Sequence, residues 1–145
     1  MREVRGNIFS QDCDAICITT NGITKIDGTA VMGKGIALQA KQRYPGIEIE
    51  HGDLIRKNGN ITQVLLDNTK PVIVALPTKH HWRDKSDINL IENSIKQLVQ
   101  ITNRKGWNRV YTVPPGCSTG SLDWKREVKP RIEEYLDDRF YVITP

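Results

Sequence analysis

The sequence predicts an α/β domain with helices layered on a central sheet, and two observations support that prediction. Short runs rich in β-branched and aromatic residues alternate with longer segments of helical periodicity along the whole chain of 145 residues. One short run, residues 72–76, is apolar at every position, as expected of a strand covered on both faces. No repeat, low-complexity segment or linker divides the chain, so we expect one domain over residues 1–145.

Six strands and three helices are expected. The strands are residues 3–5, 15–19, 64–66, 72–76, 110–113 and 140–143. The first helix should begin near Lys34 and end at Pro45, because proline cannot continue a helix. Its apolar face would contain Ile36, Ala37, Ala40 and Tyr44.

The helical pattern is clearest at residues 87–104. Its apolar face contains Ile88, Ile91, Ile95, Leu98 and Thr102. Ser86 or Asp87 can cap its start, and Gly106 lies just past its end. In the last helix an apolar residue recurs every four positions, at Trp124, Val128, Ile132 and Leu136. Because Pro130 lies inside that helix, we expect a kink or a restart there.

Composition narrows the class of protein. Hydrophobic residues make up 38% and charged residues 26%, as in ordinary globular domains. The chain lacks a run of about 18 apolar residues, so no membrane partner is expected. The first ten residues contain no apolar signal segment, and the three cysteines, an odd number, have neither CxxC nor zinc-finger spacing. We therefore expect a cytoplasmic protein with free thiols. The net charge of +4 weakly favours anionic ligands, including nucleic acid.

Two glycine-bearing loops each precede a predicted helix. Residues 27–41 run directly into the first helix, whose unpaired N–H groups and positive dipole end suit a phosphate or diphosphate. A tight structural turn is the alternative. This loop is neither a P-loop nor a dinucleotide fingerprint, because Gly35 and Leu38 replace the residues that those motifs require. The second loop, residues 114–121, has small and hydroxyl-bearing residues whose backbone amides can converge on an anion.

The end of the apolar strand carries the third candidate segment, residues 76–85. Adjacent His80 and His81 would point to opposite sides of an extended chain, so no metal site is expected. Lys79 at a strand end can act as a nucleophile or base, although a surface lysine is the common alternative. Trp82, beside Arg83, can stack on a nucleic acid strand or anchor the following helix.

Taken together, these segments resemble the macrodomain family. Residues 5–9 (RGNIF) resemble its adenine-side motif, and residues 18–21 (ITTN) resemble the loop whose asparagine reaches the distal ribose. Residues 31–37 (VMGKGIA) and 116–124 (GCSTGSLDW) resemble its two phosphate loops. Within the family, residues 32–37 (MGKGIA) and 76–83 (LPTKHHWR) are most similar to the branch that contains the DarG antitoxin and the human terminal ADP-ribose glycohydrolase.

The resemblance implies a three-layer α/β/α fold with a mixed central sheet and an ADP-ribose site at the strand ends. It further implies a metal-independent and cofactor-free glycohydrolase that releases ADP-ribose from thymidine in DNA or from a protein side chain. The implied catalytic residues are Lys79, attacking the anomeric carbon of the distal ribose, and Asn21, holding that ribose. The implied ligand-binding residues are Asn7, Ile8, Thr20, Val31, Met32, Gly33, Gly35, Ile36, Thr78, Gly116, Cys117, Ser118, Thr119, Gly120 and Ser121.

Three positions depart from the family pattern. Asn7 replaces an aspartate that bonds the adenine amine in many members, and Gly120 replaces a second catalytic aspartate of the human relative. The connection over residues 22–30 is longer than in the DarG type and can reshape the ribose pocket. A phosphatase acting on ADP-ribose 1″-phosphate and a non-catalytic ADP-ribose reader are the alternatives, as is an unrelated nucleic-acid-binding domain. The expected partner is ADP-ribose or an ADP-ribosylated substrate, with nucleic acid contact, and the expected state is a monomer.

Overall fold

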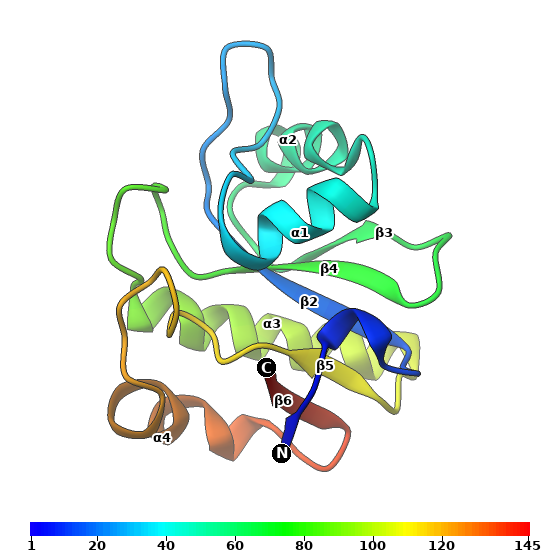
Figure 1. Cartoon of the computed structure of the whole chain (residues 1–145), viewed down its shortest axis with the longest axis vertical. Helices are drawn as coiled ribbons and strands as arrows, with labels where there is room; N and C mark the ends of the chain where they lie inside the picture. The colour runs from blue at the N-terminus through cyan, green and yellow to red at the C-terminus, as the bar shows by residue number, and fades with distance from the viewer.

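A sheet of mostly parallel strands forms the centre of the molecule (Figure 1). The computed structural model describes residues 1–145 and contains one six-stranded sheet in the order β1-β6-β5-β2-β4-β3. The strands are β1 (Arg2–Arg5), β2 (Ala15–Thr20), β3 (Gln63–Leu66), β4 (Val72–Pro77), β5 (Val110–Thr112) and β6 (Phe140–Thr144). Neighbouring strands are parallel except β3 and β4, so the sheet is mixed, as predicted.

Helices cover both faces of the sheet and give the expected three layers (Figure 1). On one face lie α1 (Gly35–Arg43) and α2 (Ile47–Asn58), and on the other α3 (Ile88–Lys105) and α4 (Lys129–Ile132). The α3 boundaries agree with the sequence: the Asp87 side chain accepts hydrogen bonds from the N–H groups of Asn89 and Leu90, and Gly106 closes the helix with φ of 70°.

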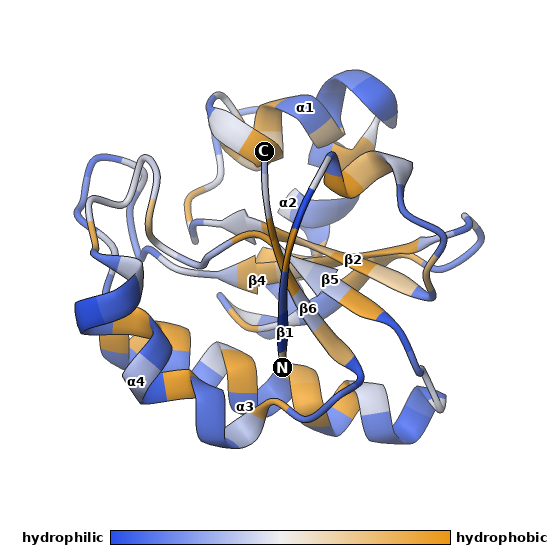
Figure 2. Cartoon of the chain, turned by 60° about the horizontal axis from the view of Figure 1, so that its bottom comes forward, coloured by the Kyte–Doolittle hydropathy of each residue, from blue (hydrophilic) through white to orange (hydrophobic).

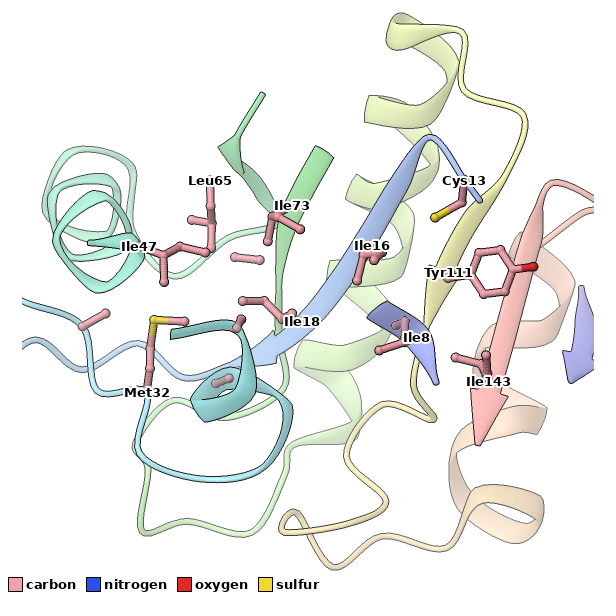
Figure 3. Close-up of a cluster of buried hydrophobic side chains, with 14 residues drawn as sticks. Ile8, Cys13, Ile16, Ile18, Met32, Ile47, Leu65, Ile73, Tyr111 and Ile143 are labelled. Atoms are coloured by element: carbon pink, nitrogen blue, oxygen red, sulfur yellow. The ribbon is translucent and has the colours of Figure 1, made fainter. Parts of the chain in front are cut away.

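The central strands supply side chains to both hydrophobic clusters. Along β2, Ile16 and Ile18 belong to the cluster under α1 and α2, whereas Ala15 and Cys17 belong to the cluster over α3 and α4. Figure 2 shows the hydrophobic strands between the two helical layers, and Figure 3 shows Ile18 beside Met32 and Ile47 in the first cluster. Burial on both faces explains why β2 and β4 are almost continuously apolar.

Two parts of the chain differ from the sequence-based expectation. Helix α2 was not predicted, because Ile47 and Ile49 alternate with glutamates at the spacing of a strand. The last helical segment is interrupted as expected, but more extensively than a single kink: a wide π-type turn (Trp124–Val128) precedes α4, and a 3-10 turn (Glu133–Tyr135) follows it. Pro130, which has no N–H to donate, lies in the first turn of α4.

Residues 22–30 form a narrow hairpin, here called the finger, that projects from the body of the molecule beside α2 (Figure 1). Thr24 and Ala30 pair across it, and Ile26 at its turn is fully exposed. Helix α2 holds the finger: the Ala30 N–H donates to the Glu48 carbonyl, and the Arg56 guanidinium donates to the Gly28 carbonyl. Gly52 of α2 has no room for a Cβ, because the Gly28 carbonyl lies against it.

None of the helices combines the length and the hydropathy that a membrane span requires.

His51 of α2 gives the fold a dependence on pH. Its side chain is 1% exposed, its Nδ1 has no hydrogen-bond partner, and burial lowers the pKa of the imidazole from 6.5 to about 4. The unfolded chain therefore binds a proton at this residue between pH 6.5 and 4 that the folded chain does not, so stability falls as pH falls through that window. From pH 7 to 5 the loss attributable to His51 is about 2 kcal/mol.

Urea unfolding of the wild type and of His51→Gln at pH 7 and pH 5 measures this contribution. The wild type should lose about 2 kcal/mol more than the variant between the two pH values. His81→Gln, which removes a half-buried histidine, is the control and should behave as the wild type does. Equal losses in the wild type and His51→Gln would contradict the assignment.

Candidate functional site

A cleft of about 900 Å³ opens where the parallel strands end, a size within the range of small-molecule sites. The residues that end or follow four parallel strands line it: Thr19, Thr20 and Asn21 after β2, Thr78 and Lys79 after β4, Val113 and Pro114 after β5, and Thr144 and Pro145 at β6. Because parallel strands bring their carboxyl ends to one edge of the sheet, segments far apart in the sequence meet here.

The first glycine-bearing loop forms one wall of the cleft and leads into α1. Val31, Met32, Gly33, Lys34 and Gly35 all line the cleft. No atom lies within 4 Å of the position that a Cβ on Gly33 would occupy, so the backbone there is open to a ligand. The N–H groups of the first turn of α1 and the Lys34 ammonium make this wall suitable for an anion.

The second glycine-bearing loop forms the opposite wall and is closely packed. A Cβ on Gly120 would collide with the Ser86 hydroxyl and would lie 2.6 Å from the Gly116 carbonyl. The Ser86 N–H donates to the Gly120 carbonyl at 3.0 Å, which fixes the two segments together. Position 120 therefore has no space for any side chain, and the carboxylate of the human relative has no counterpart at this position.

Lys79 connects the two sides of the cleft. Its backbone N–H donates to the Thr20 carbonyl, and its carbonyl accepts a hydrogen bond of 2.9 Å from Asn60 Nδ2. Its Nζ reaches across to donate to the Thr119 carbonyl at 3.2 Å. The backbone of Lys79 is thus held from two directions while its amine faces the second loop.

The charge of the lining limits the chemistry that the cleft can perform. Lys34 and Lys79 line it, but aspartate, glutamate and histidine do not. The only other titratable side chain there is the Cys117 thiol, and burial raises its pKa to about 11, so it remains protonated at neutral pH. The cleft therefore favours an anionic ligand, and the lysine amines are its available nucleophiles or bases. No three His, Cys, Asp and Glu side chains come together as metal ligands.

The two asparagines of the site make structural hydrogen bonds as well as lining the cleft. Asn21 Nδ2 donates to the Val31 carbonyl at 3.0 Å, and its Oδ1 accepts from the Ile23 N–H at 3.1 Å, so it ties the first loop to the end of β2. Asn7 Oδ1 accepts from the Phe9 N–H at 2.9 Å. This bond directs the oxygen of Asn7 to the backbone and leaves its amide NH₂ without a partner inside the chain.

Two buried hydroxyl groups in the lining lack partners. Thr20 is 6% exposed and Ser86 is 7% exposed, and neither Oγ1 of Thr20 nor Oγ of Ser86 has a hydrogen-bond partner within the chain. Buried polar groups are normally paired, so these two hydroxyls are exceptions in the wall of the cleft. The sequence pointed to Thr20 through its place in the second-strand motif, whereas no sequence signal indicated Ser86.

The structure brings nearly all the sequence-predicted site residues into one cleft. The lining includes Lys79, Asn21, Asn7, Ile8, Thr20, Val31, Met32, Gly33, Gly35, Ile36, Thr78, Gly116, Cys117, Ser118, Thr119 and Gly120. Ser121 lies outside it, in a turn with φ of 66°. The lining also contains residues that were not among the predicted catalytic and ligand-binding residues: Gly6, Thr19, Lys34, Ala37, Gln39, Trp82, Ser86, Val113, Pro114, Ile143, Thr144 and Pro145. Thr24, Lys25 and Asp27 of the finger do not line the cleft.

Sequence comparison finds relatives that share nearly all of this chain. The DNA ADP-ribosyl glycohydrolase of Thermus aquaticus is 32% identical over 143 residues, which cover 94% of this chain and 38% of the relative. The Mycobacterium tuberculosis protein of the same name is 32% identical over 151 residues, covering 97% of this chain and 40% of the relative. The chain thus spans about two fifths of the length of these curated relatives. No protein-family model matches it.

Solved structures agree with the sequence relatives. The macrodomain of Mycobacterium tuberculosis DarG has a TM-score of 0.81 at 30% identity, covering 97% of this chain and 93% of that one. The macrodomain of Thermus aquaticus DarG has a TM-score of 0.80 at 29% identity, covering 99% and 97%. The chain belongs to the macrodomain family. The family and fold implied by the resemblance are confirmed.

The packing of the two loops predicts different effects on stability when a methyl group is added to a glycine in each. Gly120→Ala must displace Ser86 or the Gly116 carbonyl, and overpacking of this kind costs about 1–3 kcal/mol, so the melting temperature should fall by several degrees. Gly33→Ala meets no neighbour and should leave the melting temperature unchanged while weakening ligand binding. Thermal unfolding of the two variants makes the comparison, and equal melting temperatures would argue against the packing described.

Proposed function

We propose that this chain binds ADP-ribose and hydrolyses the bond that joins ADP-ribose to DNA. The observation that carries the proposal is the Lys79 amine, which spans an anion-binding cleft whose lining contains no aspartate, glutamate or histidine. The relatives named DNA ADP-ribosyl glycohydrolase support both the reaction and the substrate.

The cleft offers a place for each part of ADP-ribose. The diphosphate fits between the open backbone at Gly33, beside Lys34, and the loop at residues 116–120. The adenosine would occupy the end lined by Asn7, Ile8 and Ile36. The distal ribose then lies at the other end, beside Asn21 and Lys79.

Lys79 supplies the chemistry in this proposal. Its amine nitrogen attacks the anomeric carbon of the distal ribose, and the bond from that carbon to the DNA base breaks. The proton lost by the amine is transferred to the departing base, and water then releases ADP-ribose and restores the free lysine. Asn21 contributes by holding the first loop against the end of β2, which keeps the anomeric carbon of the ribose within reach of the Lys79 amine.

We further propose that the chain acts as a monomer in the cytoplasm and contacts nucleic acid through its substrate. The net charge of +4 supports a nucleic acid substrate, and the three free thiols are compatible with a reducing compartment. The reaction as written uses groups of the chain and water alone, without a cofactor.

Release of free ADP-ribose tests the proposal. The wild type, Lys79→Ala and Lys34→Ala are incubated with DNA that is ADP-ribosylated on thymidine and with glutamate-ADP-ribosylated protein. Lys79→Ala should lower kcat on the DNA by at least about a hundredfold. Lys34→Ala, the matched control in the same cleft, should act mainly on KM, because it removes a charge that binds the diphosphate.

The other outcomes identify the rival functions. Release of ADP-ribose from the modified protein alone would mean that the substrate is protein and not DNA, with the same role for Lys79. Release of inorganic phosphate from ADP-ribose 1″-phosphate, without release from DNA, would make the chain a phosphatase. Tight ADP-ribose binding with no turnover of any substrate would make it a reader, and the glycohydrolase proposal would then be wrong.

A further inference from the structure

Trp82 lies at the edge of the cleft with much of its indole exposed. The side chain is 42% exposed and contributes to the lining, whereas Trp107 is buried and Trp124 donates its indole N–H to Glu3. No hydrogen bond from the Trp82 indole is found within the chain, and its aromatic and cationic contacts are to its sequence neighbours. A large apolar side chain left open beside a binding cleft marks an interaction surface.

The segment that carries Trp82 is fixed at both ends. His80 Nε2 bonds Asp87 Oδ2 at 2.8 Å, and the His80 carbonyl accepts from the Gly22 N–H. Within the segment, the Asp84 N–H donates to the His81 carbonyl at 3.0 Å, and at its far end Ser86 bonds Gly120. The indole is therefore presented from a defined turn, which lowers the entropic cost of stacking against it.

One cation, Arg83, and a second ring, His81, lie against the indole. The Arg83 guanidinium lies over the ring with 4.8 Å between its carbon and the ring centroid, and the His81 ring lies 5.3 Å away at an angle of 33°. Lys79 and Lys85 come from the same segment, whose one acidic residue before the helix cap is Asp84. An aromatic platform flanked by cations is the pattern that binds a single nucleic acid strand, by base stacking and phosphate attraction together.

We propose that Trp82 stacks on an unpaired base next to the ADP-ribosylated nucleotide, with Arg83 near the adjoining phosphate. The inference rests on the proposed function and adds a residue that contacts the DNA strand beside the modified nucleotide. A base in a duplex has both faces covered by its neighbours, so one tryptophan at the edge of a cleft cannot stack on it without unstacking the helix. Trp82 is thus a determinant of specificity for the strand and not for ADP-ribose.

Binding to three ligands separates the strand from ADP-ribose. All variants carry Lys79→Ala so that the ligand is not consumed, and the ligands are ADP-ribose, ADP-ribosylated thymidine, and a single-stranded oligonucleotide ADP-ribosylated on one thymine. Adding Trp82→Ala should weaken binding of the oligonucleotide about tenfold, the scale of one lost base stack. It should leave the affinity for ADP-ribose and for the modified nucleoside within about twofold.

Two further variants control for structure and chemistry. Trp82→Phe keeps an aromatic face and should retain most of the oligonucleotide affinity. Ile26→Ala removes a fully exposed apolar side chain of the finger. Because Ile26 does not line the cleft, this variant should leave the affinity for all three ligands unchanged. Circular dichroism checks that each variant is folded.

The outcomes distinguish this inference from the proposed function. If Trp82→Ala weakens the binding of all three ligands equally, or of none of them, the stacking inference is wrong, but the proposal that the chain binds ADP-ribose is unaffected. Tighter binding of a duplex than of the single strand would overturn it as well. If no variant binds any of the three ligands, the proposed function fails, and wild-type turnover of modified DNA tests that function independently.

Discussion

The parallel pairing of β2 with β4 is the constraint on which the candidate site depends. Its register places Thr20 opposite Pro77, and the Thr20 carbonyl then accepts hydrogen bonds from the N–H groups of both Thr78 and Lys79. The chain after β4 is thereby held against the end of β2 as it leaves the sheet. A shift of one residue in this pairing would reverse the faces of β4 and remove Lys79 from the cleft. The two hydrophobic clusters protect the register, because each strand buries side chains on both faces.

The two glycine-bearing loops that form the walls of the cleft differ in how tightly they are packed. The first loop is open at Gly33 and leads into the unpaired N–H groups of α1, so it can adapt to a ligand. The second loop is held by packing of Gly120 against Ser86, which also connects it to the start of α3. One wall is thus preorganised and the other accessible, an arrangement that suits a flexible ligand with a diphosphate at its centre.

The parts of the fold with a strong local signal were predictable from the sequence. The apolar run of β4, the amphipathic face of α3 and its Asp87 cap all depend on neighbouring residues, and the structure has them as expected. Helix α2 was not predictable, because its isoleucines alternate with glutamates as in a strand and it contains a glycine. Gly52 is explained only by the fold, in which the finger packs against that position. The direction of the finger, away from the cleft, is likewise fixed by bonds to Glu48 and Arg56 that no local pattern shows. Ser86 depends on its contact with Gly120, which only the fold brings close.

The central claim is that the Lys79 amine bonds the anomeric carbon during turnover, and chemical trapping tests it directly. ADP-ribosylated DNA is mixed with the wild-type protein, the reaction is quenched with borohydride, and the peptides are examined by mass spectrometry. The account predicts one ADP-ribose attached to the peptide that contains Lys79 and no adduct in Lys79→Ala. An adduct confined to the peptide of Lys34, or full turnover by Lys79→Ala, would contradict it.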